Sequence, residues 1–274
     1  MLYRRFAILL IVVAALTVLA YRSCNRSWIY FNDAETLRGQ KEYAAAASIY
    51  QRLWNSGFTK QQVFERLTES LYATTNFTGV IHVCRSALAV SAPATPAGTP
   101  VRAAEDAIPD WQARWELARA LSYTRQFDES IREYQVVLQE RPQLAKARVE
   151  LAETLYGAGQ PDAALRELLL VPEAALPEKS RLLLADLYAA NQDYDTAEII
   201  FRRHLAAHPA DTGIRVKLAD VLSWNDQYDE ALGEYETLLK QKPDDIQIRR
   251  KYANVLMWAG RNQEAAAEFK KTLK

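Results

Sequence analysis

The sequence has little of what most enzymatic and metal chemistry requires. Among 274 residues there are three histidines and two cysteines, and the nine glycines form no loop of the kind that cradles a phosphate. Neither a nucleophile elbow nor a paired-cysteine metal motif occurs. The formal net charge is +0, so no overall field attracts nucleic acid. These absences predict a chain that is not an enzyme, carries no cofactor and binds no nucleic acid.

Two of the histidines lie close together in the sequence. His204 and His208 are four positions apart and could share a metal ion on one helix face. No third ligand is evident in the sequence, however, and Pro209 ends the segment. We therefore predict no metal site.

The two cysteines also give weak signals. Cys84 is expected to be a small buried hydrophobic residue. Cys24 follows an apolar run, but the residues just before it, Tyr21-Arg22-Ser23, do not suit a lipidation signal. The spacing alone does not support a disulfide between Cys24 and Cys84.

The strongest positive signal is an internal repeat of 34 residues. Residues 218–243 read LADVLSWNDQYDEALGEYETLLKQKP, and residues 252–273 read YANVLMWAGRNQEAAAEFKKTL. Five slots pair at this one offset: Ala219 with Ala253, Leu222 with Leu256, Trp224 with Trp258, Ala231 with Ala265, and Tyr235 with Phe269. A fixed period of this length is typical of a solenoid.

Five earlier copies carry the same slots, with one residue missing near Leu168 and residues 95–110 inserted. The first small slot holds Ala185, Ala152, Ala118, Thr68 and Ala34; the large apolar slot holds Tyr188, Leu155, Leu121, Leu71 and Leu37; the second small slot holds Ala197, Ala164, Ser130, Val80 and Ala46; the aromatic slot holds Phe201, Leu168, Tyr134, Cys84 and Tyr50. The predicted copies are residues 27–60, 61–94, 111–144, 145–177, 178–211, 212–245 and 246–274.

Each copy predicts two amphipathic helices, because its apolar residues recur with a period of about 3.6 in two segments. The small residues would let the two helices approach closely, and the large apolar and aromatic residues would fill the space around that contact. Pro243, like Pro209 and Pro142, follows the second helix and stops it. No pair buries enough surface alone, so the repeats are expected to stabilise one another by stacking.

This pattern resembles the tetratricopeptide repeat family, whose small, aromatic and proline slots match Ala219, Ala231, Tyr235 and Pro243. The resemblance covers residues 27–274, although Arg215 and Arg249 stand where the family carries a tryptophan. It implies an all-α, right-handed superhelical solenoid of about seven helix–turn–helix units. It also implies a non-catalytic scaffold that binds partner proteins through a concave groove.

The chain begins with a segment that predicts membrane targeting. Residues 6–21 are an uninterrupted apolar run, with Arg4 and Arg5 before it and Arg22 after it. As a helix the run would reach about 24 Å, compared with a hydrocarbon core of about 30 Å. We expect residues 1–26 to form an N-terminal apolar helix, either an uncleaved signal anchor in the lipid bilayer or a cleaved signal peptide. Residues 91–110 carry four prolines, and the inserted residues 95–110 are either an excursion from one continuous stack or a hinge.

The positive residues ahead of the run favour a cytoplasmic N-terminus, which would place the repeats in a bacterial periplasm. The alternative is an organelle outer-membrane protein with its repeats in the cytosol.

At the C-terminal end of the sequence, the last predicted helix either is polar enough to face water or is covered by a partner.

In the family the first helix of each unit lines the groove. The resemblance places nine candidate partner-binding residues there: Arg119, Tyr123, Glu153, Tyr156, Asp186, Asp220, Trp224, Asn254 and Trp258. The aromatic residues could anchor a peptide or a sugar ring, or could pack between adjacent helices. The acidic residues favour a basic or neutral ligand over a carboxylate.

Two functions follow. The first is a membrane-held scaffold of a bacterial envelope assembly. The alternative is a carbohydrate-binding module of exopolysaccharide export, since the LSW and LMW segments around Trp224 and Trp258 are similar to repeats of that machinery.

Overall fold

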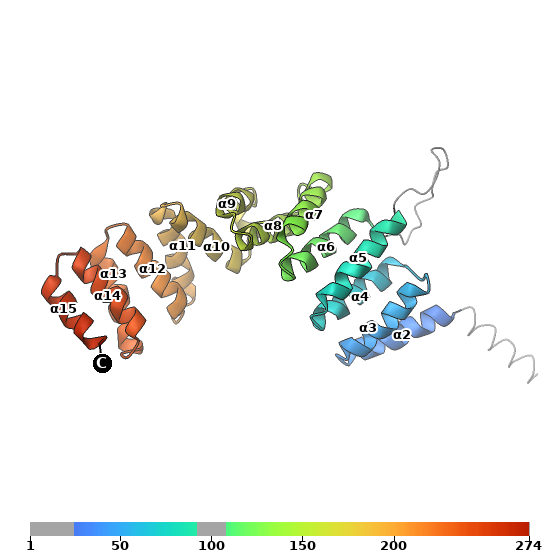
Figure 1. Ribbon diagram of the computed structural model, residues 1–274, viewed down its shortest axis with the longest axis horizontal. Helices are drawn as coiled ribbons and strands as arrows, with labels where there is room; N and C mark the ends of the chain where they lie inside the picture. The colour runs from blue at the N-terminus through green and yellow to red at the C-terminus, as the bar shows by residue number, and fades with distance from the viewer. Residues whose placement is uncertain (1–24, 92–107, 274) are drawn as a thin grey trace, which may run out of the picture. The chain divides into compact units, whose positions relative to one another are not determined.

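The computed structural model describes residues 25–91 and 108–273, and within these ranges it contains fourteen α-helices, one short 3₁₀ helix and no strand (Figure 1). The elements are α2 (Arg26–Gly39), α3 (Tyr43–Asn55), α4 (Gln61–Ala73), α5 (Phe77–Ser91), α6 (Asp110–Tyr123), α7 (Phe127–Glu140), α8 (Ala145–Gly157), α9 (Pro161–Leu169), η1 (Glu173–Ala175), α10 (Glu178–Ala190), α11 (Tyr194–Ala207), α12 (Thr212–Trp224), α13 (Tyr228–Gln241), α14 (Ile246–Trp258) and α15 (Asn262–Lys271). Consecutive helices form seven helix–turn–helix pairs, which confirms the predicted all-α repeat fold.

Two of the predicted segments fall outside this description. The apolar run of residues 6–21 lies outside the described residues, and so does most of the proline-rich stretch of residues 95–110. Among the helices that the structure describes, none combines the length and the apolar character needed to cross a membrane.

The described chain divides after Ala147 into two compact units. The first unit contains α2 to α7, and α5 packs directly on α6 although the proline-rich stretch separates them in the sequence. The second unit contains α9 to α15 together with most of α8. Each unit has its own apolar core.

The two helices of each pair touch through the small residues that the sequence places there. Ala34, Ala118 and Ala219 of the first slot are completely buried, and so are Ala46 and Ala231 of the second. The third pair shows how near the helices come, because the Ser130 hydroxyl of α7 donates a 2.7 Å hydrogen bond to the Ala118 carbonyl of α6. A larger side chain at either slot would force the helices apart.

The aromatic slot lies in the core, as predicted. Tyr50, Tyr134, Phe201 and Tyr235 are each at most 1% exposed. Cys84, which occupies this slot in the second pair, is a fully buried free cysteine, and burial raises the pKa of its thiol.

One turn geometry recurs between the helices of all seven pairs. The backbone N–H just past the turn donates to the carbonyl of the large apolar slot at 2.8–2.9 Å, as from Gln126 to Leu121 and from Arg261 to Leu256. This bond closes the first helix when the residue before the donor adopts a left-handed conformation. Glycine fills that position at Gly159 and Gly260, whereas Lys41, Thr75, Arg125, Gln192 and Asp226 fill it elsewhere with φ between 54° and 64°.

In several pairs an arginine of the first helix forms an ion pair with a glutamate of the second helix. This arginine occupies the slot where the family carries a tryptophan, and we call the contact the brace. Arg215 of α12 contacts Glu234 of α13 at 2.5 Å and donates to the Pro209 carbonyl at 2.8 Å. Arg249 pairs with Glu268 in the same way at 2.6 Å. These side chains are only 16–20% exposed, so the brace replaces apolar packing with a partly buried ion pair.

The fourth pair departs from the pattern. Its second helix, α9, has 9 residues, compared with 14 in α11 and α13. Pro172 and Pro177 lie in the segment that follows, which forms the turn η1 in place of further helix. The sequence shows only one residue missing near Leu168, but in the structure the second helix is several residues shorter and is followed by the turn η1.

The left-handed turn residues predict a stabilising substitution. Gln192 has φ 63°, a conformation that costs a residue with a Cβ about 1–2 kcal/mol and costs glycine nothing. We expect Gln192→Gly to raise the free energy of unfolding by about 0.5–1 kcal/mol, after allowing for the greater freedom of glycine in the unfolded chain. Urea denaturation followed by circular dichroism measures the change. Gln192→Ala is the matched control, and it should bring no gain because alanine keeps the Cβ.

Candidate binding surface

All nine candidate residues lie on the first helices of their pairs, on what we call the first-helix surface. Arg119 and Tyr123 lie on α6, Glu153 and Tyr156 on α8, Asp186 on α10, Asp220 and Trp224 on α12, and Asn254 and Trp258 on α14. The four aromatic residues among them are 48–61% exposed, so none belongs to the core. Their apolar area is available to a ligand.

The carboxylates of this surface in the second unit are paired with lysines. Lys217 of α12 contacts both oxygens of Asp186, at 2.6 and 2.8 Å, and Lys251 of α14 pairs with Oδ2 of Asp220. Glu153 is 3.3 Å from Lys179. The acidic line that the sequence appears to place here is therefore neutralised by lysines of the next pair. Because these carboxylates are already paired, a neutral ligand fits this surface better than a basic one.

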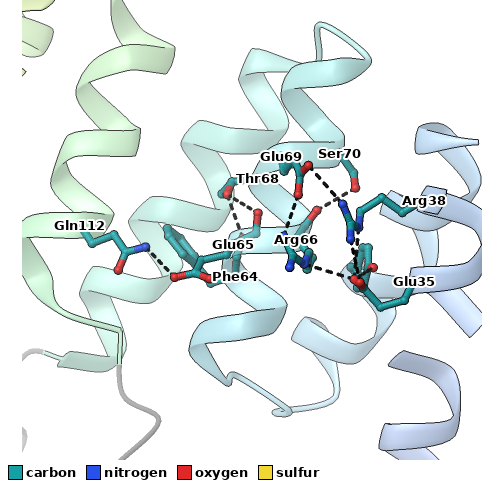
Figure 2. Close-up of polar contacts among 10 residues, drawn as sticks. Glu35, Arg38, Phe64, Glu65, Arg66, Thr68, Glu69, Ser70 and Gln112 are labelled. Carbon is teal, nitrogen blue, oxygen red and sulfur yellow. Dashed lines mark hydrogen bonds and ion pairs between the residues drawn. The ribbon is translucent and has the colours of Figure 1, made fainter. Parts of the chain in front are cut away.

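The same contact occurs in the first unit with arginine in place of lysine (Figure 2). Arg66 of α4 lies 3.3 Å from Glu35 of α2 and 3.1 Å from Glu69 of its own helix. Arg38 joins the cluster at 2.8 Å from Glu35 and 3.3 Å from Glu69. Two cations and two carboxylates alternate, so these four charges are paired with one another.

In two of the pairs, a buried tyrosine of the second helix donates a hydrogen bond to the carboxylate on the first helix. Tyr50 donates its hydroxyl proton to Glu35, and Tyr235 donates to Asp220 from the same slot. Burial acts to raise the pKa of Glu35, but the hydrogen bonds from Arg38 and Tyr50 outweigh burial and hold that pKa below its usual value. Burial and the bond to Asp220 raise the pKa of Tyr235 well above its ordinary range. The carboxylate stays ionised and the tyrosine stays a donor.

An aromatic pocket of about 480 Å³ lies beside the paired charges of the second unit. Trp224 at the end of α12 and Tyr194 at the start of α11 form its aromatic wall, with ring centroids 6.1 Å apart. Asp186 and Lys217 line the pocket next to them. The site thus combines an exposed aromatic surface with a fixed ion pair.

The first unit has an equivalent pocket of about 490 Å³, built from the same slots. Tyr123 and Phe77 take the places of Trp224 and Tyr194, and their rings stack with centroids 4.8 Å apart. Arg119 occupies the slot of Asp220 and lies 4.9 Å from the Tyr72 ring, while Glu116 pairs with it at 2.9 Å. The charges are exchanged but remain paired, and the aromatic wall remains.

A different cavity lies between the helices at the point where α9 is short. It has a volume of about 570 Å³ and is lined mainly by apolar side chains of the α9–η1 segment and of α10 and α11, among them Leu168, Leu176, Leu182, Ile199 and Ile200. It differs from the two aromatic pockets because residues of the shortened α9 and of the turn after it form part of its wall.

Comparison with known proteins identifies the repeat. A model of the tetratricopeptide repeat family matches residues 123–187, 188–254 and 225–274, which together span more than half of the chain. The chain belongs to the tetratricopeptide repeat family. No curated protein sequence matches it.

Solved tetratricopeptide repeat structures share the fold. A crystal structure of the MamA protein is 22% identical, has a TM-score of 0.51, and covers 60% of this chain and 90% of its own. The structure of YrrB, described as a TPR protein with an unusual peptide-binding site, is 15% identical with a TM-score of 0.53, and covers 59% and 84%. At these identities the likeness concerns the fold. Together with the family match, it supports a protein-interaction scaffold.

The sequence alone does not reveal the partners of the candidate residues. Tyr194 and Phe77, which complete the aromatic walls, belong to second helices, whereas the resemblance points to first helices only. Lys217 and Lys251 were also missed, although their spacing of one repeat was a usable signal. Lys217 follows Asp186, and Lys251 follows Asp220, at the same spacing of 31 residues. In a tetratricopeptide repeat protein, such a recurring pair of opposite charges indicates an ion pair between neighbouring helix pairs.

The low pKa of Glu35 predicts a dependence of stability on pH. A carboxyl whose pKa falls on folding stabilises the protein above its unfolded pKa, near 4.5, and this contribution is lost as the pH falls through the folded value. The difference in unfolding free energy between wild type and Glu35→Gln should therefore be larger at about pH 7 than at about pH 3.5. Urea titrations at both values measure it.

The matched control is Glu42→Gln, which changes an exposed carboxylate just before α3. Its effect should be small at either pH. If the Glu35→Gln difference does not shrink in acid, the cluster of Figure 2 does not stabilise the folded state through the charge of Glu35.

Proposed function

We propose that this protein is a non-catalytic scaffold that binds peptide segments of a partner protein at the aromatic pockets of its first-helix surface, each pocket within one unit. The observation that carries the proposal is the equivalent pair of aromatic pockets, one in each unit, formed by Tyr123 with Phe77 and by Trp224 with Tyr194. A pocket that recurs from slot to slot suits a ligand that is itself a chain with regularly spaced side chains.

The charges beside the pockets indicate the kind of peptide. The carboxylates Asp186 and Asp220 are already satisfied by Lys217 and Lys251, so a strongly basic or acidic peptide would have to break these pairs. A segment with aromatic or aliphatic anchors and little net charge fits best. The unusual peptide-binding site named for YrrB is consistent with a peptide ligand on this fold.

The N-terminal sequence supports a place for the scaffold at a membrane. Residues 6–21 are apolar and flanked by arginines, as expected for an anchor that leaves the repeats in a bacterial periplasm. We propose that the scaffold serves an envelope assembly from that position. A cleaved signal would make it a soluble periplasmic adaptor instead, and an organelle outer membrane remains the alternative location.

A second candidate function rests on the two exposed tryptophans. Trp224 and Trp258 are 53% and 50% exposed and stand one repeat apart. Flat aromatic faces at a regular spacing suit the apolar faces of successive sugar rings. A carbohydrate-binding role in exopolysaccharide export is therefore the alternative.

The test is a selection from a random-peptide display library on the full-length chain, followed by fluorescence anisotropy with the selected peptides. We expect Trp224→Ala to weaken binding at least tenfold, or about 1.4 kcal/mol, because it removes the exposed wall of the pocket. Val136→Ala is the matched control, since Val136 is 39% exposed but lies on the second helix α7, away from the described pockets. It should leave the affinity unchanged.

The outcomes separate the two candidates. Peptides that bind Trp224→Ala as tightly as wild type would contradict a peptide site in this pocket. Titration with cello-oligosaccharides and with oligomers of N-acetylglucosamine tests the alternative, which requires sugar binding that is lost in Trp224→Ala and in Trp258→Ala.

A further inference from the structure

The two neighbouring histidines do have a third potential ligand in the structure. Glu178, the first residue of α10, places one carboxylate oxygen 2.8 Å from Nδ1 of His204 and 2.9 Å from Nε2 of His208. The ligating atoms of the three side chains all lie within 4.8 Å of one another. The sequence could not show this, because Glu178 comes from another helix, 26 residues before His204.

A fourth residue fixes the orientation of one imidazole. Nε2 of His204 lies 3.0 Å from Oδ2 of Asp211, and the His204 side chain is only 10% exposed. The other oxygen of Asp211 accepts the backbone N–H of Ile214 at 3.0 Å and caps α12. With Nε2–H donating to Asp211, the lone pair of Nδ1 points at Glu178. A carboxylate behind a histidine is the arrangement that orients metal-binding imidazoles.

The cluster needs positive charge between its members. With Nδ1 of His204 carrying its lone pair, that nitrogen and the carboxylate oxygen of Glu178 are two acceptors 2.8 Å apart, and they repel unless a proton or a cation lies between them. The nitrogen of His208 approaches the same oxygen. Glu178 and Asp211 together carry two negative charges, which balance one divalent cation.

We propose that Glu178, His204 and His208 form a binding site for a divalent transition-metal ion of the zinc class. Two imidazoles and one carboxylate are ligands that Zn²⁺ accepts, with a fourth position left to water or to a donor from a partner. Bonds of about 2.0–2.1 Å in a tetrahedral site place ligand atoms about 3.3 Å apart, so the cluster has to open by about 0.5 Å. Glu178 and His208 are both exposed, so this adjustment does not disturb the core.

The position of the site gives the metal a structural consequence. Glu178 begins α10, His208 caps the end of α11, and Asp211 caps the start of α12. A metal ion would therefore join the open ends of two helices that are otherwise connected by their turn at the far end. It would also support the cap of the next pair through His204 and Asp211.

Zn²⁺ alone is the probe that tests the site. Full-length, untagged chain is treated with EDTA, dialysed and titrated with ZnCl₂ by calorimetry, and its Tm is measured with and without the metal. Wild type should bind one equivalent and its Tm should rise. Asp211→Asn should weaken binding about 10–100-fold while keeping a residue that caps α12. His208→Ala and Glu178→Gln, which remove ligands, should weaken it at least as much and abolish the rise in Tm.

His82→Ala is the matched control, because His82 is the third histidine and lies exposed on α5. It should bind Zn²⁺ like wild type. The proposal is overturned if wild type binds no stoichiometric Zn²⁺, or if His208→Ala and Glu178→Gln bind it as tightly as wild type does.

Discussion

The close approach of two helices through small residues is the constraint on which the rest of this structure depends. Ala219 and Ala231 are fully buried, and at the equivalent slots of the third pair a serine hydroxyl of one helix reaches the backbone of the other. Large side chains flank this contact. Tyr235 and Leu222 are buried in a core to which residues of three consecutive pairs contribute, so the pairs stabilise one another by stacking.

Stacking in turn determines the charge pattern of the first-helix surface. When one first helix lies against the next, the carboxylate of one pair comes within reach of a cation of the following pair, as Asp186 does with Lys217. The tyrosine that donates to Asp220 belongs to the aromatic slot, so the core and the surface are joined through one side chain. The result is a surface on which charge fixes geometry and aromatic area remains free for a ligand.

The sequence was sufficient for the fold because the fold is set by periodic slots. A small residue, a large apolar residue and a turn recur at one spacing, and each has a single packing role whichever pair it belongs to. The sequence also placed all nine candidate residues on first helices, as the structure has them. Contacts between pairs were harder to predict, because long side chains such as Lys217 reach a partner that the helical period of their own segment does not reveal. The shortening of α9 was hidden for another reason, since Pro172 and Pro177 redirect several residues while removing only one.

Local departures from the repeat pattern make one helix pair chemically different from the others. Arg181 stands in the slot of Arg215, but the position 19 residues later, which holds Glu234 in the next pair, is occupied by Ile200. The loss of this brace and the short α9 open the apolar cavity between α10 and α11, and the cluster of Glu178 and the two histidines lies at the same end of these helices. The two aromatic pockets, by contrast, share an aromatic wall and paired charges, although the signs of the charges are exchanged between them. The cluster of Glu178, His204 and His208 occurs once among the described residues, so the proposed metal site would distinguish the fifth pair from the others.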